Sequence, residues 1–147
     1  MKKCNFELDT VLRYKGQVLD SRLAEHGAVL AQVNRQEEVL GQAQQNLWGC
    51  VEEDREKQAM GMTVMDAMRY QTGIEVLEKA VRREEEKLAR LRQLEEEKRA
   101  RVVEAKQETS SLEKLKEIKR GEYDYALQKE EEKRIDDLVS ARWAAHG

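Results

Sequence analysis

The sequence predicts an all-α fold in which two long helices pair as an antiparallel coiled-coil hairpin. The 147 residues include no proline, and Glu, Lys, Arg, Gln, Leu and Ala are abundant. Because proline breaks a helix interior, its absence leaves long uninterrupted helices possible. Charged residues make up 39% of the chain and aromatic residues 5%, so a thick globular core is not expected. Apolar residues recur at heptad spacing in both halves of the chain, which predicts two paired helices.

The first helix is predicted to run from about residue 5 to about residue 58. Steps of seven give one nearly continuous apolar column, made of Leu12, Leu19, His26, Val33, Leu40 and Leu47. A column four residues further along contains Gly16, Leu23, Leu30, Glu37, Gln44 and Val51. Since coiled coils bury residues at alternating steps of four and three, these two columns are the predicted seam of the first helix.

A turn is predicted at about 59–63, centred on Gly61. Glycine readily adopts the positive φ that ends a helix, and Thr63 with Asp66 three residues later forms a weak capping box for the next helix. Four methionines surround this turn, namely Met60, Met62, Met65 and Met68. We expect them to provide adaptable packing around the turn, and the alternative is a contact surface for a partner.

The second helix is predicted to run from about 64 to about 142, with two further seam columns. One contains Ile74, Val81, Leu88, Glu95, Val102, Thr109, Lys116 and Tyr123, and the other contains Leu77, Glu84, Leu91, Lys98, Ala105 and Leu112. The polar members Glu84, Glu95 and Lys98 are expected to weaken the seam without ending it. The whole chain, 1–147, is predicted to be a single coiled-coil domain.

The pairing register predicts that the second helix is longer and ends in a C-terminal overhang. If the turn centres near Gly61, residue i lies opposite residue 122 minus i, so Asn5 pairs near Glu117. The second helix then outruns the first by about 25 residues, or roughly 35–40 Å at the helical rise. The apolar residues expected to lack a partner within the chain are Tyr123, Leu127, Ile135, Leu138, Val139 and Trp143. Another molecule is expected to cover them, unless the overhang is a frayed, solvated helix.

Charge and hydropathy argue against several functions. The net charge is −3 and both signs are mixed along the chain, which does not favour nucleic acid as a partner. The first residues lack the apolar segment of a secretory signal, and the longest uncharged run is too short to span a bilayer. We therefore expect a cytoplasmic protein in which Cys4 and Cys50 are reduced.

Catalytic chemistry is not expected either. A rod of two helices offers few concave sites, and catalysis needs convergent polar groups in such a site. His26 and His146 are distant in sequence, no Cys or His stands at metal-ligand spacing, and there is no glycine-rich phosphate loop. The sequence predicts no enzyme, no metal or cofactor and no small-molecule substrate.

Three segments carry a resemblance to a known family: "FELDTVLRYK" near the start, "YQTGIEVLEKAV" after the turn, and "LEKLKEIKRGEYDYALQKEEEKRIDDLVSAR" near the end. Over nearly its whole length the chain resembles FliJ, the small coiled-coil component of the bacterial flagellar type III export apparatus. The most specific part is the last segment, with Leu112, Leu115, Lys116, Glu122, Tyr123, Asp136, Asp137, Leu138 and Arg142.

The resemblance implies a non-enzymatic role in protein export for flagellum assembly, and hence for motility and chemotaxis. FliJ proteins are similar to the central stalk of rotary ATPases, whose chain ends enter the pore of a hexameric ring. The overhang would then bind the export ATPase hexamer, with candidate contacts at Tyr123, Leu127, Ile135, Leu138 and Arg142.

The resemblance also implies further partners, which are the membrane protein of the export gate and the export chaperones. Candidate gate contacts are Tyr70, Leu77 and Ala80. The implied location is peripheral, at the cytoplasmic face of the inner membrane at the flagellar base. Two alternatives are a coiled-coil scaffold or tether without ATPase contact, and the equivalent stalk of a virulence-type secretion system.

Overall fold

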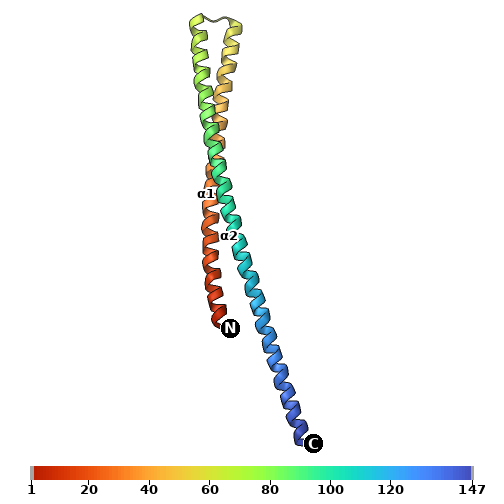
Figure 1. Cartoon of the computed structure of the whole chain (residues 1–147). Coiled ribbons are helices and arrows are strands. Elements are labelled where there is room, and N and C mark those ends of the chain that lie inside the picture. Colours follow the sequence, from red (N-terminus) through yellow and green to blue (C-terminus); the bar gives the residue numbers. More distant parts are fainter. Residues whose placement is uncertain (1, 147) are drawn as a thin grey trace. The chain divides into compact units, whose positions relative to one another are not determined.

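The computed structural model describes the backbone of residues 2–146 and the side chains of residues 7–146. It contains helix α1 (Lys2–Met60) and helix α2 (Val64–His146), with no strand in the described part of the chain. Figure 1 shows the two helices joined by one short turn. The all-α hairpin with a longer second helix is therefore confirmed. Both helices extend slightly beyond the predicted limits of 58 and 142.

Each helix contributes to two compact units. The turn unit is Ser21–Val102, which includes the turn and the helical segments on either side of it. The terminal unit combines Met1–Asp20 with Val103–Gly147. In each unit a piece of α1 packs antiparallel against a piece of α2. That 1–147 folds as a single domain stays a prediction.

The turn has the predicted chemistry. Gly61 has a φ of 94°, a conformation that side chains with a Cβ rarely adopt. Its N–H donates to the carbonyl of Gln58 at 3.3 Å, which closes the end of α1. The N–H of Asp66 donates to Thr63 Oγ1 at 3.1 Å, so Thr63 caps the start of α2.

The core of the turn unit is a narrow row of aliphatic side chains. Val29, Val33 and Leu88 are buried and pack together, and Leu40, Leu91 and Leu94 lie against them. Val81 and Val102 are also buried. These positions confirm the first predicted column of α1 and both columns of α2.

The second predicted column of α1 is wrong. Leu23 and Leu30 remain 42% and 38% exposed. The buried or half-buried positions instead lie three residues after the first column, at Arg22, Val29, Gln36, Ala43 and Cys50. A heptad seam can place its second column either three or four residues after the first, and Leu23 and Leu30 favoured the spacing of four. Of the polar residues at the correct positions, Gln36 finds a partner on α2, and Arg22 pairs with Glu25 of α1.

Polar residues of the seam are matched across the two helices. Gln36 Nε2 donates to the carbonyl of Glu84 at 3.1 Å and also to its carboxylate. His26 Nε2 lies 2.8 Å from Glu95 Oε1, and Arg99 donates to the same oxygen at 2.6 Å. Among the described residues, no buried side-chain nitrogen or oxygen lacks a hydrogen-bond partner. Glu95 is only 7% exposed, so a slip in register would leave a buried carboxylate unpaired.

The predicted register of 122 is confirmed in both units. In the turn unit, the numbers of paired residues add to 121 for His26 with Glu95 and to 120 for Gln36 with Glu84. In the terminal unit, Lys15 Nζ lies 2.8 Å from Glu108 Oε2, and these numbers add to 123. The pairing therefore departs little from the expected alignment.

Replacement of the most buried leucine tests the core. Leu88 is 5% exposed, so Leu88→Ala should lower the free energy of unfolding by about 2–5 kcal/mol through lost burial and a cavity. The same change at exposed Leu138 should cost less than about 0.5 kcal/mol. Urea unfolding followed by circular dichroism measures both. Equal losses would contradict the assigned seam.

Acid should weaken the seam through its paired carboxylates. The hydrogen bond from His26 and the neighbouring Arg99 lower the pKa of Glu95, and Gln36 lowers the pKa of Glu84. A carboxyl with a lowered folded-state pKa adds stability above the unfolded pKa, about 4.3, and loses it as the pH falls through the folded value. When the melting temperature is measured as a function of pH, Glu95→Gln should therefore reduce its fall at acid pH. Exposed Glu96→Gln is the control, and a fall unchanged by Glu95→Gln would argue against the pairing.

Candidate binding surfaces

The C-terminal segment of α2, residues 124–146, is the largest unpaired part of the described chain. Every residue in it is exposed, whereas Leu112 and Lys116 of the same helix are half-buried against α1. In Figure 1, α2 continues past the start of α1 within the terminal unit. The predicted overhang is confirmed.

Large apolar side chains lie exposed on two sides of this end of α2, not on a single stripe. Leu127 and Leu138 continue the face of the seam, because spacings of four and eleven residues after Tyr123 and Leu127 return to the same side. They form the seam-side strip. Ile118, Tyr125, Val139 and Trp143 lie about 100–180° further round the helix and form the outer strip. Ile135 stands between the two strips.

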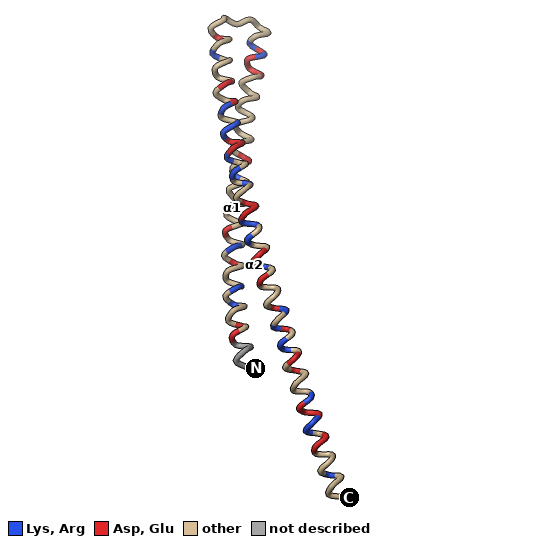
Figure 2. Tube along the Cα trace, in the orientation of Figure 1, with Lys and Arg blue, Asp and Glu red and all other residues tan. Residues whose placement is uncertain are grey.

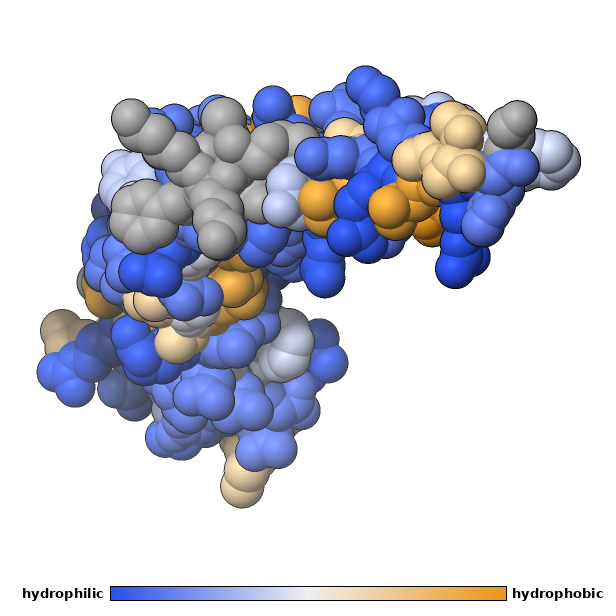
Figure 3. All heavy atoms as spheres, turned by 90° about the horizontal axis from the view of Figure 1, so that it is seen from below, coloured by the Kyte–Doolittle hydropathy of each residue, from blue (hydrophilic) through white to orange (hydrophobic). Residues whose placement is uncertain are grey.

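The exposure of these strips is substantial, at 63% for Leu138 and 77% for Trp143. Figure 3 views the molecule from below and shows hydrophobic residues as separate patches in a largely hydrophilic surface.

The charges of the C-terminal segment are of both signs. Figure 2 shows acidic and basic residues alternating along this end of α2. Arg134 lies 2.6 Å from Glu131, and Lys129 lies 3.6 Å from Glu132. Lys129 Nζ also lies 5.5 Å from the centre of the Tyr125 ring. These exposed pairs contribute little to stability, so the basic side chains can exchange partners at low cost.

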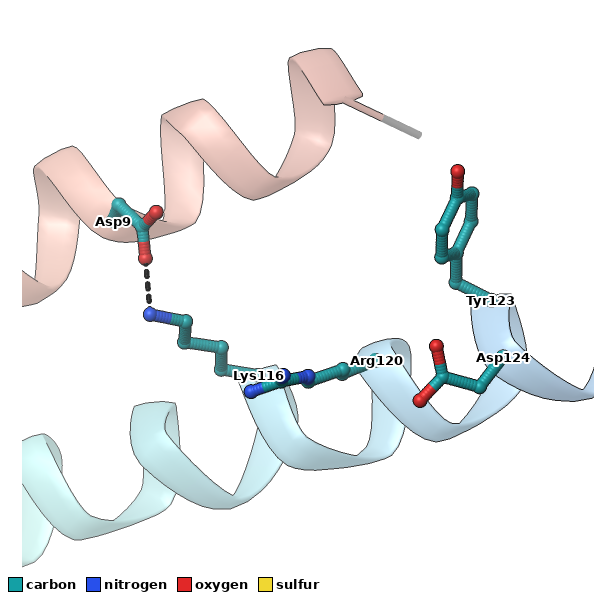
Figure 4. Close-up of a pocket in the computed structure, with 5 residues that line it drawn as sticks. All are labelled: Asp9, Lys116, Arg120, Tyr123 and Asp124. Carbon is teal, nitrogen blue, oxygen red and sulfur yellow. Dashed lines mark ion pairs between the residues drawn. The ribbon is translucent and has the colours of Figure 1, made fainter.

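A hollow of about 350 Å³ marks the base of the C-terminal segment. It is lined by Asp9, Lys116, Arg120, Tyr123 and Asp124. Figure 4 shows Lys116 reaching across to Asp9 of α1, with which it forms an ion pair. Tyr123 is half-buried here, so the expectation that it lacks a surface within the chain is wrong. It occupies the seam column of Lys116, and every described residue of α2 after it is exposed.

The three residues predicted to contact the export gate lie near the turn, and all are half-buried. Tyr70 donates its hydroxyl hydrogen to Glu53 Oε1 at 3.0 Å, and Lys57 Nζ lies 5.3 Å from the centre of its ring. The interaction with Tyr70, and to a lesser degree that with Glu53, raises the pKa of Lys57. Leu77 occupies a seam column, and Ala80 lies beside it. These residues therefore serve the pairing of the helices whatever else they contact.

Other apolar side chains are exposed at the turn end. They are Trp48, Val51, Met60, Val64, Met65, Met68 and Val76, which we call the turn patch. Met60 is 88% exposed, and Met65 and Met68 help to line an open hollow of about 350 Å³. The prediction that Met60, Met65 and Met68 pack around the turn is therefore wrong. The alternative, that they form a contact surface for a partner, fits their exposure. Sequence reasoning missed Val76, although its place between seam residues Ile74 and Leu77 indicates exposure.

The titratable residues of the described chain are arranged for pairing between and along the helices. Within the residues described, no three or more His, Cys, Asp or Glu side chains are grouped so that they could hold a metal ion. In the same part of the chain, neither helix has a stretch apolar enough to cross a membrane.

The fold defines an all-α coiled-coil protein, in which two helices pair antiparallel and the longer one has an exposed end. The chain matches the flagellar FliJ protein family over residues 4–147, and it belongs to that family. It is thus a structural component of the flagellar export apparatus, in a family not known for enzymes. The comparisons with curated proteins and with solved structures each give no significant match.

Two neighbouring residues separate packing from surface exposure near the turn. Leu77 lies in the seam, so Leu77→Ala should lower the free energy of unfolding by about 1–3 kcal/mol. Val76 is 59% exposed, and Val76→Ala should change it by less than about 0.5 kcal/mol. Chemical unfolding of both variants provides the measurement. A larger loss for Val76→Ala would mean that the two positions are assigned the wrong way round.

Proposed function

We propose that the chain binds the hexameric export ATPase through residues 124–146, in the manner of a central stalk. The observation that carries the proposal is that two apolar strips face different sides of an exposed helix. A helix that docks on one flat surface needs a single apolar stripe. Strips on two sides suit a partner that surrounds the helix, as the pore of a ring does.

The polar residues of the segment suit the same partner. Lys133 and Arg142 are exposed and interleaved with the strips, and the ion pairs of Lys129 and Arg134 are exposed. Carboxylates lining a pore would attract these cations during association, and the strips would supply short-range packing. Leu127, Ile135, Leu138 and Arg142 remain the proposed contacts, and the outer strip joins them. Tyr123 contributes at the edge of the contact, since it is already half-buried.

The turn end is proposed to link the ATPase to the membrane protein of the export gate and to export chaperones. The exposed turn patch supports this role, because methionine side chains adapt to partners of different shape. Tyr70, Leu77 and Ala80 hold the helices together beneath it and contact the gate at their exposed edges. The protein then works at the cytoplasmic face of the inner membrane. In a binding assay with the gate protein, Val76→Ala should lose affinity while its stability is unchanged.

The second candidate is a scaffold or tether that joins other export proteins without touching the ATPase. It would also use the turn patch, but it assigns no partner to the two strips. The stalk of a virulence-type secretion system is less favoured, because the chain belongs to the flagellar family.

Removal of the C-terminal segment tests the proposal. A chain ending at residue 123 should keep its paired helices, because residues 124–146 are exposed, yet it should no longer stimulate ATP hydrolysis by the reconstituted export ATPase. Ile135→Ala combined with Leu138→Ala should reduce stimulation, and so should Val139→Ala combined with Trp143→Ala. Each pair removes apolar area of the kind that dominates interfaces, and a loss of about tenfold or more in affinity is expected.

Exposed Val103→Ala lies outside the segment and serves as the matched control. Circular dichroism establishes that every variant stays helical. If the shortened chain stimulates the ATPase as well as the intact one, the tether replaces the stalk. If only one of the two pairs matters, the partner docks on one side and does not surround the helix.

A further inference from the structure

The turn unit has a second uncovered apolar face, on the outer side of α1. Leu23 and Leu30 are seven residues apart and therefore lie on one face, beside the buried column of Val33. On their solvent side, α1 presents only short uncharged residues at Gly27 and Ala31. In a chain with 39% charged residues, an uncharged surface of two helical turns is unusual. Neither the seam nor the proposed ring contact uses it.

Two arginines of α2 border this face. Arg92 lies 3.1 Å from Glu37, and Glu37 stands seven residues after Leu30 in the same column of α1. Arg99 lies one heptad further along α2, and the register of about 122 places it at the level of Leu23, as it places Arg92 at the level of Leu30. Both arginines are exposed, and each bond in the structure uses one terminal nitrogen. A guanidinium has five N–H donors, so each of the two arginines can also donate hydrogen bonds to a further carboxylate.

Gly27 has no side chain, so nothing projects from the helix surface at the middle of this face. A Cβ added at Gly27 would meet nothing within 4 Å, so packing inside the hairpin does not require glycine there. Glycine weakens a helix interior relative to alanine, and its advantage is that another backbone can approach closely. We call the surface bounded by Leu23, Gly27 and Leu30 on α1 and by Arg92 and Arg99 on α2 the lateral groove.

We propose that the lateral groove binds an amphipathic helix of a partner protein that carries carboxylates along one edge. Its apolar residues pack on Leu23 and Leu30, its backbone passes over Gly27, and its carboxylates pair with Arg92 and Arg99. Charge decides between this occupant and a second copy of the chain. The same groove of a second copy would bring two more arginines, and the carboxylates that lie against them, Glu37 and Glu95, are already paired.

The test uses the full-length chain and two synthetic helical peptides of about three heptads, with leucine at the two core positions. One peptide carries glutamate along one edge, and the other carries lysine at the same positions. Fluorescence anisotropy should show the acidic peptide binding about tenfold or more tightly than the basic one. Its affinity should fall as salt is added, because the ion pairs are exposed.

Variants of the chain locate the binding. Leu23→Ala with Leu30→Ala should weaken the acidic peptide by about tenfold. Gly27→Gln should block it without destabilising the hairpin, since the added side chain meets open space. Glu37→Gln should tighten binding, because it releases Arg92 from a competing carboxylate. Val39→Ala, an exposed apolar change outside the groove, is the matched control and should have no effect.

Three outcomes would overturn the proposal. The first is equal binding of the acidic and basic peptides, and the second is no binding of either. The third is self-association of the intact chain in analytical ultracentrifugation that the Leu23→Ala, Leu30→Ala variant abolishes, which would make a second copy the occupant. Weaker binding after Glu37→Gln would likewise contradict the role given to Arg92.

Discussion

The contact on which the arrangement depends is the buried carboxylate of Glu95, held between His26 of α1 and Arg99 of α2. Aliphatic side chains in a coiled coil tolerate a slip of one heptad, because one leucine replaces another. A buried charge does not, because the slip would leave it without partners. Gln36 with Glu84 adds a second matched layer. The alignment of the helices, and hence the length of α2 that remains unpaired, follows from such layers.

The helices, the turn and the register could all be predicted from local features. Absence of proline, heptad leucines and Gly61 each act within a few residues, so they can be read from the sequence. The second seam column of α1 could not, because its choice depends on partners distant in sequence. Arg22 and Gln36 look unsuitable for a seam until α2 is placed beside them, whereas Leu23 and Leu30 look suitable and are exposed.

The candidate surfaces were predictable in position but not in composition. The register located the unpaired end of α2, but it could not reveal that Tyr123 is sheltered or that apolar side chains occupy two sides of the helix. Near the turn, the family resemblance indicated Tyr70 and Leu77 as contacts, but their positions bury them in part. The exposed residues include Val76, Met60, Met65 and Met68. Their exposure depends on which way the neighbouring seam residues face.

The C-terminal segment has a helix without tertiary contacts, and this affects its local stability. Most helical stability in proteins comes from tertiary packing, which residues 124–146 lack, so they belong to the low end of the stability distribution. Gly121 stands where pairing ends, with nothing within 4 Å of an added Cβ. The segment therefore opens and exchanges its amide hydrogens faster than the paired part of α2. A partner must order this segment fully when it binds, and that ordering costs free energy. Residues of high helix propensity on the solvent-facing side lower this cost, so they can raise the affinity without changing any contact.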